Sequence, residues 1–491
     1  MTNLLLTDLE LKLEKITLKL PIENILLNPF YRISKGTPEQ LKQYETLHGK
    51  YSYVIVLIRL LLSVLVAPLK ILLYITFSMI YRNASTNFCK GILRSDVIFL
   101  SHALSGSLNQ SPDDQFYGEQ PRIIASKRKV SIVYTNHFRN KYKSNSNLLL
   151  RKIPNVQGLL IPKFLSPLEN YQYLRTMLKL IHQSFRALLL SDDLNYKDKN
   201  ILLLGISKTF SRATYSNYLL QVNILKVLTL SHCKSLVLTL EGHSYEDHLY
   251  KLIESKGLRI KCIYYQHSPI VLGHIGIKTF LRTIEKPLEI LTTGPIYSTY
   301  LSNLAPHHNY SVVGSMKFSR SLQSKDKVLS QRILFTPEGT NLHSVEFTKL
   351  ASTLSRALPN YEVAIRFHPN LSKGLKLRLL ILKMTYQKNF SVSKLSLNQD
   401  LYESKYVVFR SSAVGVETLT RNSIPLFISD EEFEDLNVFS IFPEAPFPLA
   451  QKDSLMDLIT NQIEVDSSKS EFYSLQMLVP VNKVLWEAAL L

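Results

Sequence analysis

The chain has 491 residues, of which 45% are hydrophobic and 20% are charged. This length and balance predict two or three globular domains and exclude an intrinsically disordered chain. With 58 Lys and Arg against 39 Asp and Glu, the net charge of +19 predicts a surface that attracts anions. Because the basic residues are scattered and no zinc-finger spacing or RNP-like motif occurs, we expect no nucleic-acid partner.

The cysteine content and the N-terminal sequence both favour a cytoplasmic protein. Cys89, Cys233 and Cys262 show no metal-ligand spacing and are odd in number, which is typical of a reducing compartment. The sequence begins without a charged segment followed by a cleavable apolar core, so we do not expect secretion.

Residues 1–90 predict a helical N-terminal extension whose composition changes sharply at an apolar segment, residues 53–80. The first 50 residues indicate amphipathic helix and loop and carry no visible chemistry. Arg59 and Pro68 interrupt the apolar run before it reaches the roughly 20 residues that span a bilayer. A simple transmembrane helix is therefore disfavoured.

Two interpretations of the apolar segment stay open. In the first it lies in the headgroup region of the inner membrane, with Arg59, Lys70 and Arg82 directed toward anionic lipid. In the second it forms a buried helical hairpin packed on the globular body. Under the first interpretation the protein is peripherally associated with the membrane.

Beyond residue 90, short apolar runs alternate with longer helical stretches, two of which fall near 168–190 and 211–231. Nearly continuous apolar strands joined by helices are typical of a parallel sheet that is covered on both faces. The strands expected in this first series are 97–100, 130–134, 201–204, 236–240 and 260–265.

A second series of strands follows, so we predict an α/β protein with two tandem Rossmann-like domains. The expected boundaries are 91–288 for the first domain and 289–465 for the second, with a helical tail at 466–491. Ligands of such domains bind at the carboxyl ends of the strands. The strands expected in this series are 290–293, 311–313, 333–336, 363–367, 406–409 and 424–428.

Three strand ends carry residues suited to catalysis or anion binding. Glu241 follows an apolar strand and precedes a glycine, so it is a candidate general base. Pro369 ends the expected strand 363–367, so that His368 lies at the edge of the sheet, where its imidazole can donate to a phosphate. Ser411 and Ser412 precede a helix with a small-residue first turn, an arrangement that binds anions. Each motif alone also fits a surface acid, a loop or an ordinary helix cap.

Taken in order, the Glu-Gly, His-Pro and Ser-Ser motifs resemble those of GT-B transferases of bacterial surface carbohydrates that use cytidine-nucleotide donors. These include capsular polysialyltransferases and Kdo transferases, with the CDP-glycerol glycerophosphotransferases as relatives. The resemblance implies a GT-B architecture with an acceptor domain followed by a donor domain. It also implies Glu241 as base, and His368, Ser411 and Ser412 as ligands of the donor phosphates.

The resemblance covers roughly residues 90–460 and includes one departure. The related motif has two acidic residues before its glycine, whereas Leu240 stands at the first of those positions. Glu246 is therefore an alternative base. The stretch Glu241–Glu246, followed by a strand that ends in Gln266 and His267, also resembles a family of surface-carbohydrate biosynthesis proteins that lack assigned reactions. We expect Gln266, His267 and Glu246 to contact the acceptor, although His267 equally fits a structural bond to a loop.

Four further residues are candidates for contacts with the donor nucleotide. Arg366 precedes the His-Pro pair, and Thr336 begins a strand-to-helix loop whose backbone amides can approach a phosphate. Gly314 belongs to a similar loop. Glu417 lies one turn into the helix after Ser412, where a glutamate often meets the donor ribose in enzymes of this type; it equally suits the helix dipole.

We expect a glycosyltransferase that needs no metal and no organic cofactor, because no Asp-X-Asp, Gly-X-Gly-X-X-Gly or Walker motif occurs. Its expected partners are a nucleotide-sugar donor, for which we expect a cytidine nucleotide, and a glycan or lipid-linked acceptor of capsule, O-antigen or lipopolysaccharide assembly. Two alternatives stay open: a CDP-glycerol-type glycerophosphotransferase, and a non-catalytic scaffold or regulator of polysaccharide assembly.

Overall fold

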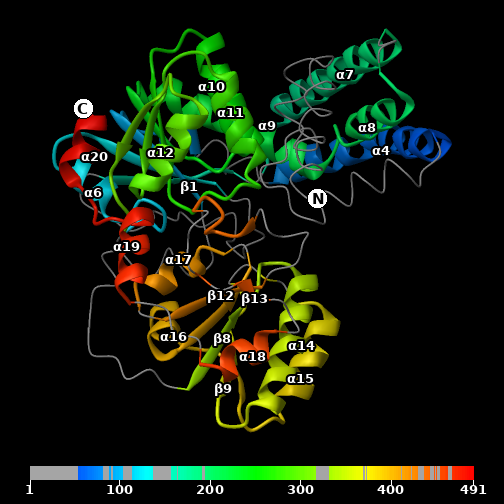
Figure 1. Ribbon diagram of the computed structural model, residues 1–491. Coiled ribbons are helices and arrows are strands. Elements are labelled where there is room, and N and C mark those ends of the chain that lie inside the picture. The colour runs from blue at the N-terminus through cyan, green and yellow to red at the C-terminus, as the bar shows by residue number, and fades with distance from the viewer. Residues whose placement is uncertain are drawn as a thin grey trace. The chain divides into compact units, whose positions relative to one another are not determined.

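Figure 1 shows the computed structural model of the chain, whose residues fall into two compact units that we describe separately. The N-terminal unit comprises the described residues of Asn3–Tyr265, His274–Ile290 and Glu487–Leu491, and the C-terminal unit those of Gln266–Gly273 and Leu291–Trp486. The described residues are 53–80, 88–89, 92–102, 113–135, 156–162, 164–190, 194–316, 331–368, 371, 373–410, 412–421, 423–428, 436–442, 447, 449–450, 454–462 and 467–490.

The first sheet has seven strands in the order β3-β2-β1-β4-β5-β6-β7. Strand β1 pairs in parallel with both β2 and β4, so that Val97 lies opposite Val130 on one side and Ser235 on the other. All residues of β1, β2 and β4 are buried, as expected for strands that are covered on both faces. The strands are β1 Val97–His102, β2 Val130–Thr135, β3 Val156–Leu160, β4 Ser235–Thr239, β5 Lys261–Gln266, β6 Glu289–Thr292 and β7 Asn309–Val312.

The expected strand at 201–204 is wrong, because these residues lie inside helix α8, Tyr196–Ser207. The side chain of Asn195 accepts the backbone N–H of Asp198 at 2.9 Å and starts the helix. A short apolar run is compatible with either a buried strand or a buried helix, and its period cannot separate the two. The N-cap at Asn195 was the signal for a helix.

The helices predicted near 168–190 and 211–231 are confirmed as α7 and α9. A capping box begins α7: Ser166 accepts the backbone N–H of Glu169, and the Glu169 carboxylate accepts that of Ser166 at 2.8 Å. The helices of the N-terminal unit are α4 Tyr53–Ile80, α6 Gln120–Ile124, α7 Pro167–Leu189, α8 Tyr196–Ser207, α9 Arg212–Ser231, α10 Ser244–Ser255 and α11 Ile275–Thr283.

The apolar segment forms one continuous helix, α4, of 28 residues, rather than a hairpin. It contacts α7 and α8, and the three helices lie together in Figure 1. In the part of the chain that the structure describes, no helix is both long and apolar enough to cross a membrane. The expectations for residues 1–50 and for Arg82 fall outside the described residues.

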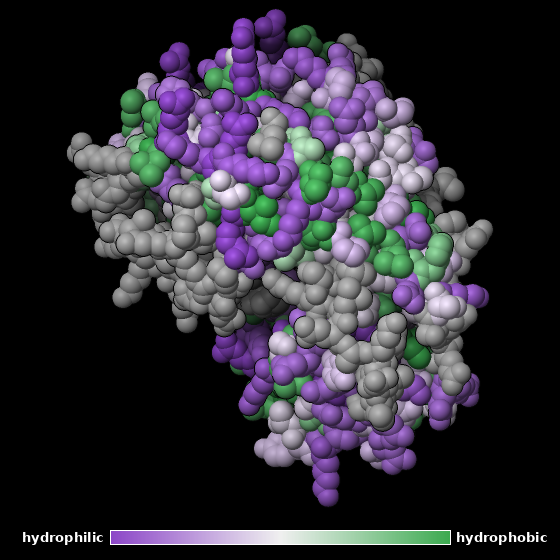
Figure 2. Space-filling view, turned by 90° about the vertical axis from the view of Figure 1, so that its left-hand side faces the viewer, coloured by the Kyte–Doolittle hydropathy of each residue, from purple (hydrophilic) through white to green (hydrophobic). Residues whose placement is uncertain are grey.

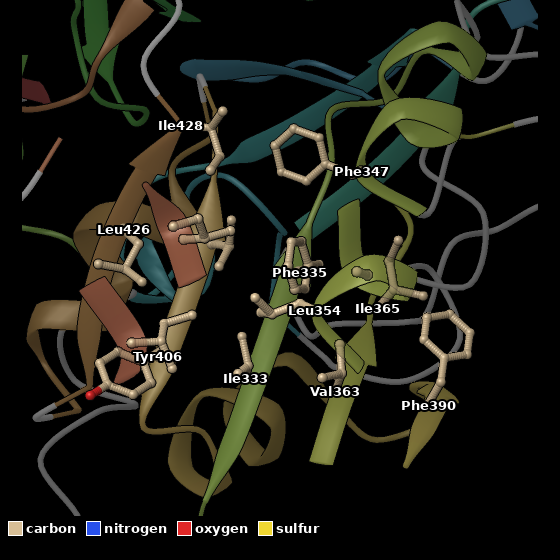
Figure 3. Close-up of a cluster of buried hydrophobic side chains, with 14 of the residues drawn as sticks. Ile333, Phe335, Phe347, Leu354, Val363, Ile365, Phe390, Tyr406, Leu426 and Ile428 are labelled. Carbon is tan, nitrogen blue, oxygen red and sulfur yellow. The ribbon is translucent and has the colours of Figure 1, made fainter. Parts of the chain in front are cut away.

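The second sheet has six strands in the order β10-β9-β8-β11-β12-β13, and every neighbouring pair is parallel. Figure 3 shows the apolar core on one face of this sheet, where Phe335 and Val363 from the strands meet Phe347 and Leu354 from helix α14. Both sheets thus confirm an α/β protein built on parallel strands. The strands are β8 Arg332–Thr336, β9 Glu362–Ile365, β10 Phe390–Val392, β11 Tyr406–Phe409, β12 Ile424–Ile428 and β13 Leu449–Ala450.

Helix α12, Pro295–Leu304, packs on β7 of the first sheet, several later helices accompany the second sheet, and the chain ends in two more. The side chain of Thr340 begins α14 by accepting the backbone N–H of His343 at 3.3 Å. A capping box formed by Ser396 and Gln399 begins α16. The helices are α12 Pro295–Leu304, α14 Asn341–Ala357, α15 Leu375–Met384, α16 Leu397–Glu403, α17 Val414–Leu419, α18 Leu455–Thr460, α19 Ser467–Met477 and α20 Lys483–Leu490.

Candidate functional site

The order of the first sheet reverses direction between β1 and β4, because β2 and β3 lie on one side of β1 and β4 starts the other side. In doubly wound sheets, ligands bind at the carboxyl ends of the strands beside such a switch point. Strand β1 ends at His102, and β4 is followed within four residues by Glu241 and His243. The predicted base therefore stands at the position that the topology favours for chemistry.

The turn that carries Glu241 is held from inside by Glu246, in the first turn of α10. The backbone N–H groups of Glu241 and Gly242 donate to the Glu246 carboxylate at 3.1 and 2.8 Å. Gly242 has a φ of +74°, and a Cβ there would lie 2.4 Å from the backbone nitrogen of Ile277 in α11. The glycine is thus required by the close approach of α11. The Glu241 side chain is 25% exposed at the end of the strand.

Glu246 is fully buried, in contrast to Glu241. Burial, together with the charge of Glu241, raises the pKa of Glu246 to about 8, although the charge of His243 and the two backbone N–H groups oppose this shift. In this position Glu246 supports the turn. A direct contact between its carboxylate and an acceptor would require the turn to open, so the geometry favours Glu241 over Glu246 as the base.

His243 is a site residue to which the sequence assigned no role. Its Nε2 lies 2.8 Å from Oε2 of Glu241, its side chain is 40% exposed, and its ring stacks on Tyr245 with 5.5 Å between centroids. Burial lowers the pKa of His243, but the hydrogen bond and charge of Glu241, with the charge of Glu246, outweigh burial and raise that pKa to about 9. At neutral pH the pair is an imidazolium bonded to a carboxylate.

A second series of polar contacts lies at the same strand ends and involves residues of β1 and β2. Nδ1 of His102 lies 2.6 Å from the hydroxyl of Thr135, and Nε2 of His102 lies 3.4 Å from the hydroxyl of Tyr245. Burial, with the charges of Glu246 and Glu241, raises the pKa of Tyr245 well above its ordinary value, so its hydroxyl keeps its proton. The sequence signal for His102 and Thr135 was a polar residue at the end of each apolar strand.

The predicted acceptor residues Gln266 and His267 differ in their surroundings. The amide of Gln266 is buried: Oε1 accepts the backbone N–H and the hydroxyl of Thr293 at 3.0 and 3.1 Å, and Nε2 donates to the carbonyl of Ser268. Gln266 therefore fastens the end of β5 to the loop after β6. His267 is partly exposed, which leaves it the better placed of the two for contact with a ligand.

The second sheet reverses direction between β8 and β11, so its switch point lies beside Thr336 and the residues after Phe409. His368 follows the end of β9 by three residues and is exposed. A Cβ added to Gly339, in the loop after β8, would lie 3.3 Å from Nδ1 of His368. The loops after β8 and β9 therefore bring the predicted histidine to the switch point. Desolvation by its neighbours lowers the pKa of His368 below the ordinary value of 6.5, so the neutral ring, which donates one N–H, predominates at pH 7.

The Ser-Ser motif follows β11, and Ser411 falls outside the described residues. The hydroxyl of Ser412 accepts the backbone N–H of Val414 at 3.3 Å, which makes it a local turn bond at the start of α17. Helix α17 has six residues, and Glu417 lies partly exposed in its first turn. Arg410, which is 1% exposed, fixes the start of this loop through a two-nitrogen contact with the carboxylate of Glu346 at 3.2 and 3.4 Å.

Arg366 and Thr336 have internal partners at the same edge of the sheet. Nη1 of Arg366 donates to Asp400 at 2.9 Å and to the carbonyl of Leu395 at 2.6 Å, and buried Asp400 also accepts Arg332 at 3.0 Å. The hydroxyl of Thr336 donates to the carbonyl of Val408 in β11 at 3.2 Å, and Thr336 is buried. These bonds give the side chains of both residues structural roles, which do not require a donor nucleotide.

Gly314 also has a structural explanation. Its φ is +81°, and a Cβ would lie 2.2 Å from the carbonyl oxygen of Pro480. On either side of it, the N–H of Ser315 donates to the carbonyl of Val479 at 2.9 Å, and the N–H of Asn482 donates to the carbonyl of Val313 at 2.9 Å. The C-terminal segment thus crosses directly over the glycine that was predicted to bind the donor.

Among the residues that the structure describes, no group of three or more His, Cys, Asp or Glu side chains is arranged to hold a metal ion. The cluster around Glu241 pairs acids with imidazole, hydroxyl and backbone donors. Groups of these kinds can transfer protons and form hydrogen bonds.

Comparison with models of known families found no match, and neither did comparison with curated protein sequences. Three solved structures to which the chain is similar are the following. The putative UDP-N-acetylglucosamine 2-epimerase from Listeria monocytogenes is 9% identical, over 81% of this chain and 94% of that one, with a TM-score of 0.45. The UDP-GlcNAc 2-epimerase of Methanocaldococcus jannaschii is 11% identical, over 77% and 98%, with a TM-score of 0.43. The glycosyltransferase SnogD from Streptomyces nogalater is 11% identical, over 81% and 94%, with a TM-score of 0.38.

One fold hosts many unrelated functions, so the function depends on the site residues rather than on these similarities.

Proposed function

We propose that the protein is a GT-B-type glycosyltransferase of bacterial surface polysaccharide assembly, which transfers a sugar from a nucleotide donor to a glycan or lipid-linked acceptor. One observation carries the proposal. The Glu-Gly motif follows β4 at the switch point of the first sheet, and the His-Pro and Ser-Ser motifs follow β9 and β11 at or next to the switch point of the second sheet. The acceptor is assigned to the strand ends of the first sheet and the donor to those of the second sheet.

In the N-terminal unit, Glu241 removes the proton of the acceptor hydroxyl as that oxygen attacks the anomeric carbon of the donor. His243 is bonded to one carboxylate oxygen of Glu241, which fixes the direction of the other oxygen. The imidazolium of His243 also suits an acceptor that carries a carboxylate or phosphate near the reacting hydroxyl. Acidic sugars and lipid-linked phosphates share this feature.

In the C-terminal unit, negative charge builds on the departing nucleotide phosphate as the glycosidic bond breaks. The exposed imidazole of His368 donates a hydrogen bond to that phosphate, and Ser411 and Ser412 supply further donors. The backbone of the loop at Gly339 lies against His368 and is open to the same group. This donor set stabilises the leaving group without a metal ion. The proposal includes a cytidine nucleotide as donor and peripheral attachment to the inner membrane, where a lipid-linked acceptor is presented.

The proposal is tested by calorimetric titration of the full chain with CMP, CDP, UDP and GDP. We expect one base to bind preferentially, with CMP or CDP tightest, and His368→Ala to weaken that binding. Incubation with a panel of activated donors and mass analysis of the products then identifies the group transferred.

Three outcomes would contradict parts of the proposal. A glycerol phosphate adduct would assign the protein to the glycerophosphotransferases, and preference for UDP or GDP would exclude the cytidine donor. Absence of nucleotide binding, together with absence of donor hydrolysis at high protein concentration, would identify a non-catalytic scaffold.

A further inference from the structure

The exposed side of α4 is apolar along most of the helix. Leu65 is 72% exposed, and Leu69 and Leu72 are 58% and 59% exposed. Positions three, four and seven residues apart lie on one face of a helix, so these side chains form a stripe rather than isolated contacts. The side of the molecule in Figure 2, by contrast, is mostly hydrophilic where it is described, with smaller apolar groups between. The exposed large apolar residues of α4 are Ile58, Leu61, Leu62, Leu65, Val66, Leu69, Leu72, Leu73, Phe77 and Met79.

The other side of α4 is fixed to the N-terminal unit. Ala67 is 1% exposed, and the ring of Tyr74 stacks on that of Tyr215 with 4.1 Å between the centroids. Because α4 packs against α7 and α8, it cannot cross a bilayer without drawing those helices in with it. The geometry therefore suits a helix that lies along a surface and not one that spans it.

Helix α7, which contacts α4, adds a row of positive charge. Arg175, Lys179 and Arg186 are exposed, and in the described part of the chain no ion pair involves them. The single acid of α7, Glu169, pairs with Lys226 of α9, and α4 contains no acid at all. We call the exposed residues of α4 together with Arg175, Lys179 and Arg186 the α4–α7 surface.

We propose that the α4–α7 surface docks the protein on the anionic face of a lipid bilayer, with the leucines of α4 inserted among the acyl chains and the basic row of α7 against the headgroups. Apolar insertion next to basic side chains is the combination that holds peripheral helices on anionic membranes. This inference specifies the membrane attachment that forms part of the proposed function, but it does not depend on the transferase reaction.

A second copy of the chain is the main rival occupant. In a two-fold contact each patch meets itself, so Arg175, Lys179 and Arg186 would face their own equivalents or lie close to them. The absence of exposed acids on α4 and α7 leaves no complementary charge for such a contact. Charge complementarity therefore favours anionic lipid.

The test is flotation of the full-length protein with vesicles of phosphatidylcholine alone and of phosphatidylcholine with phosphatidylglycerol, at low and high salt. The first variant replaces Leu65, Leu69 and Leu72 by Gln. We expect its vesicle-bound fraction to fall by roughly tenfold or more on both vesicle types, because apolar insertion is lost. The second variant replaces Arg175, Lys179 and Arg186 by Gln. We expect it to lose the preference for anionic vesicles, and the salt dependence with it.

Helix α15 provides a matched control, because it exposes three leucines next to lysines in the C-terminal unit. Leu375, Leu379 and Leu382 are 74%, 57% and 62% exposed, so their replacement by Gln removes as many exposed leucines from a different surface. We expect this variant to bind vesicles like the wild type, and all three variants to keep the wild-type Tm.

Two results would overturn the proposal. One is wild-type vesicle binding in the α4 variant, whatever the α15 variant shows. The other is a change in oligomeric state in the α4 variant, seen by light scattering, without a change in vesicle binding. Because binding is measured without donor or acceptor, failure of the transferase proposal leaves the result unaffected.

Discussion

The position of the His368 imidazole depends on its neighbour Gly339. Two substitutions therefore disturb the proposed donor site differently: one removes the imidazole and the other displaces it. A Cβ at Gly339 would lie 3.3 Å from Nδ1 of His368, close enough to displace the imidazole by a few tenths of an ångström. We expect His368→Ala to lower turnover by roughly ten- to a thousandfold, as the loss of one transition-state donor does. Gly339→Ala should lower turnover by a smaller factor, because the donor is displaced and not removed.

The control for both variants is thermal stability, which should stay close to the wild type because His368 is exposed. Steady-state turnover with the preferred donor is the measurement. Wild-type turnover in His368→Ala would remove this residue from the site.

Glu246 gives the N-terminal unit a stability that depends on pH. Burial, the main cause, with the charge of Glu241, raises its pKa from the ordinary value of 4.5 to about 8. Between these values the folded protein holds a proton that the unfolded chain has released. The contribution to the free energy of unfolding is therefore full below pH 4.5 and is lost as the pH rises through about 8. The raised pKa of His243 acts in the same direction.

We expect Glu246→Gln to flatten this dependence, because its amide cannot ionise. Urea unfolding of wild type and variant at pH 5, 7 and 9 measures the difference, and the wild type should lose stability relative to the variant toward pH 9. Parallel curves for the two proteins would show that Glu246 does not titrate in this range.

The positions of some candidate residues could be predicted from the sequence, whereas their long-range contacts could not. Glu241 and His368 follow strands, and a strand end next to a glycine or proline is visible in the sequence. The partners of Arg366 and Gly314 are Asp400 and Pro480, which lie 34 and 166 residues away by number, and no local pattern connects them. Their structural roles follow only from packing. His102 was missed because its relation to Tyr245 spans 143 residues.

At the scale of elements, the C-terminal segment passes so close to Gly314 that only glycine fits at this position. Gly314 and Gly257 have similar positive φ values, +81° and +63°, but no atom lies within 4 Å of a Cβ at Gly257. We expect Gly257→Ala to cost about 1 kcal/mol of unfolding free energy, because a left-handed backbone disfavours a Cβ. Gly314→Ala should cost a further ~3 kcal/mol or more, because it also collides with Pro480.

Urea unfolding of the two variants beside the wild type measures this difference, with Gly257→Ala as the matched control for backbone strain. Equal decreases in unfolding free energy in the two variants would mean that the C-terminal segment does not sterically restrict position 314.

The elements themselves were largely predictable where their apolar runs were continuous. Strands such as β2, β8 and β11 contain four or more buried apolar or β-branched residues in sequence, and their expected positions are confirmed. The edge strands β3 and β10 were not expected: β3 contains a glycine and a glutamine, and β10 has three residues. The run at 201–204 was assigned to the wrong type, since a helix fully buried at these positions looks the same in sequence.

At the scale of the whole molecule, the structure shows where some of the basic residues behind the net charge of +19 lie. Part of it lies along α7 beside an apolar helix, and part of the positive charge near the sheets is neutralised internally, as in Arg332 and Arg410. The proposed function uses the remainder to attract an anionic donor and an anionic surface. A long-range field of this kind raises association rates at low salt and contributes little to the fold.

The chain contains a single tryptophan, Trp486, which is 1% exposed in the C-terminal segment that crosses Gly314. Its backbone N–H donates to the carbonyl of Asn482 at 3.1 Å, so the indole moves with that segment. Indole emission shifts to longer wavelength when water reaches the ring. A red shift of the tryptophan fluorescence would therefore report that the C-terminal segment has detached from Gly314.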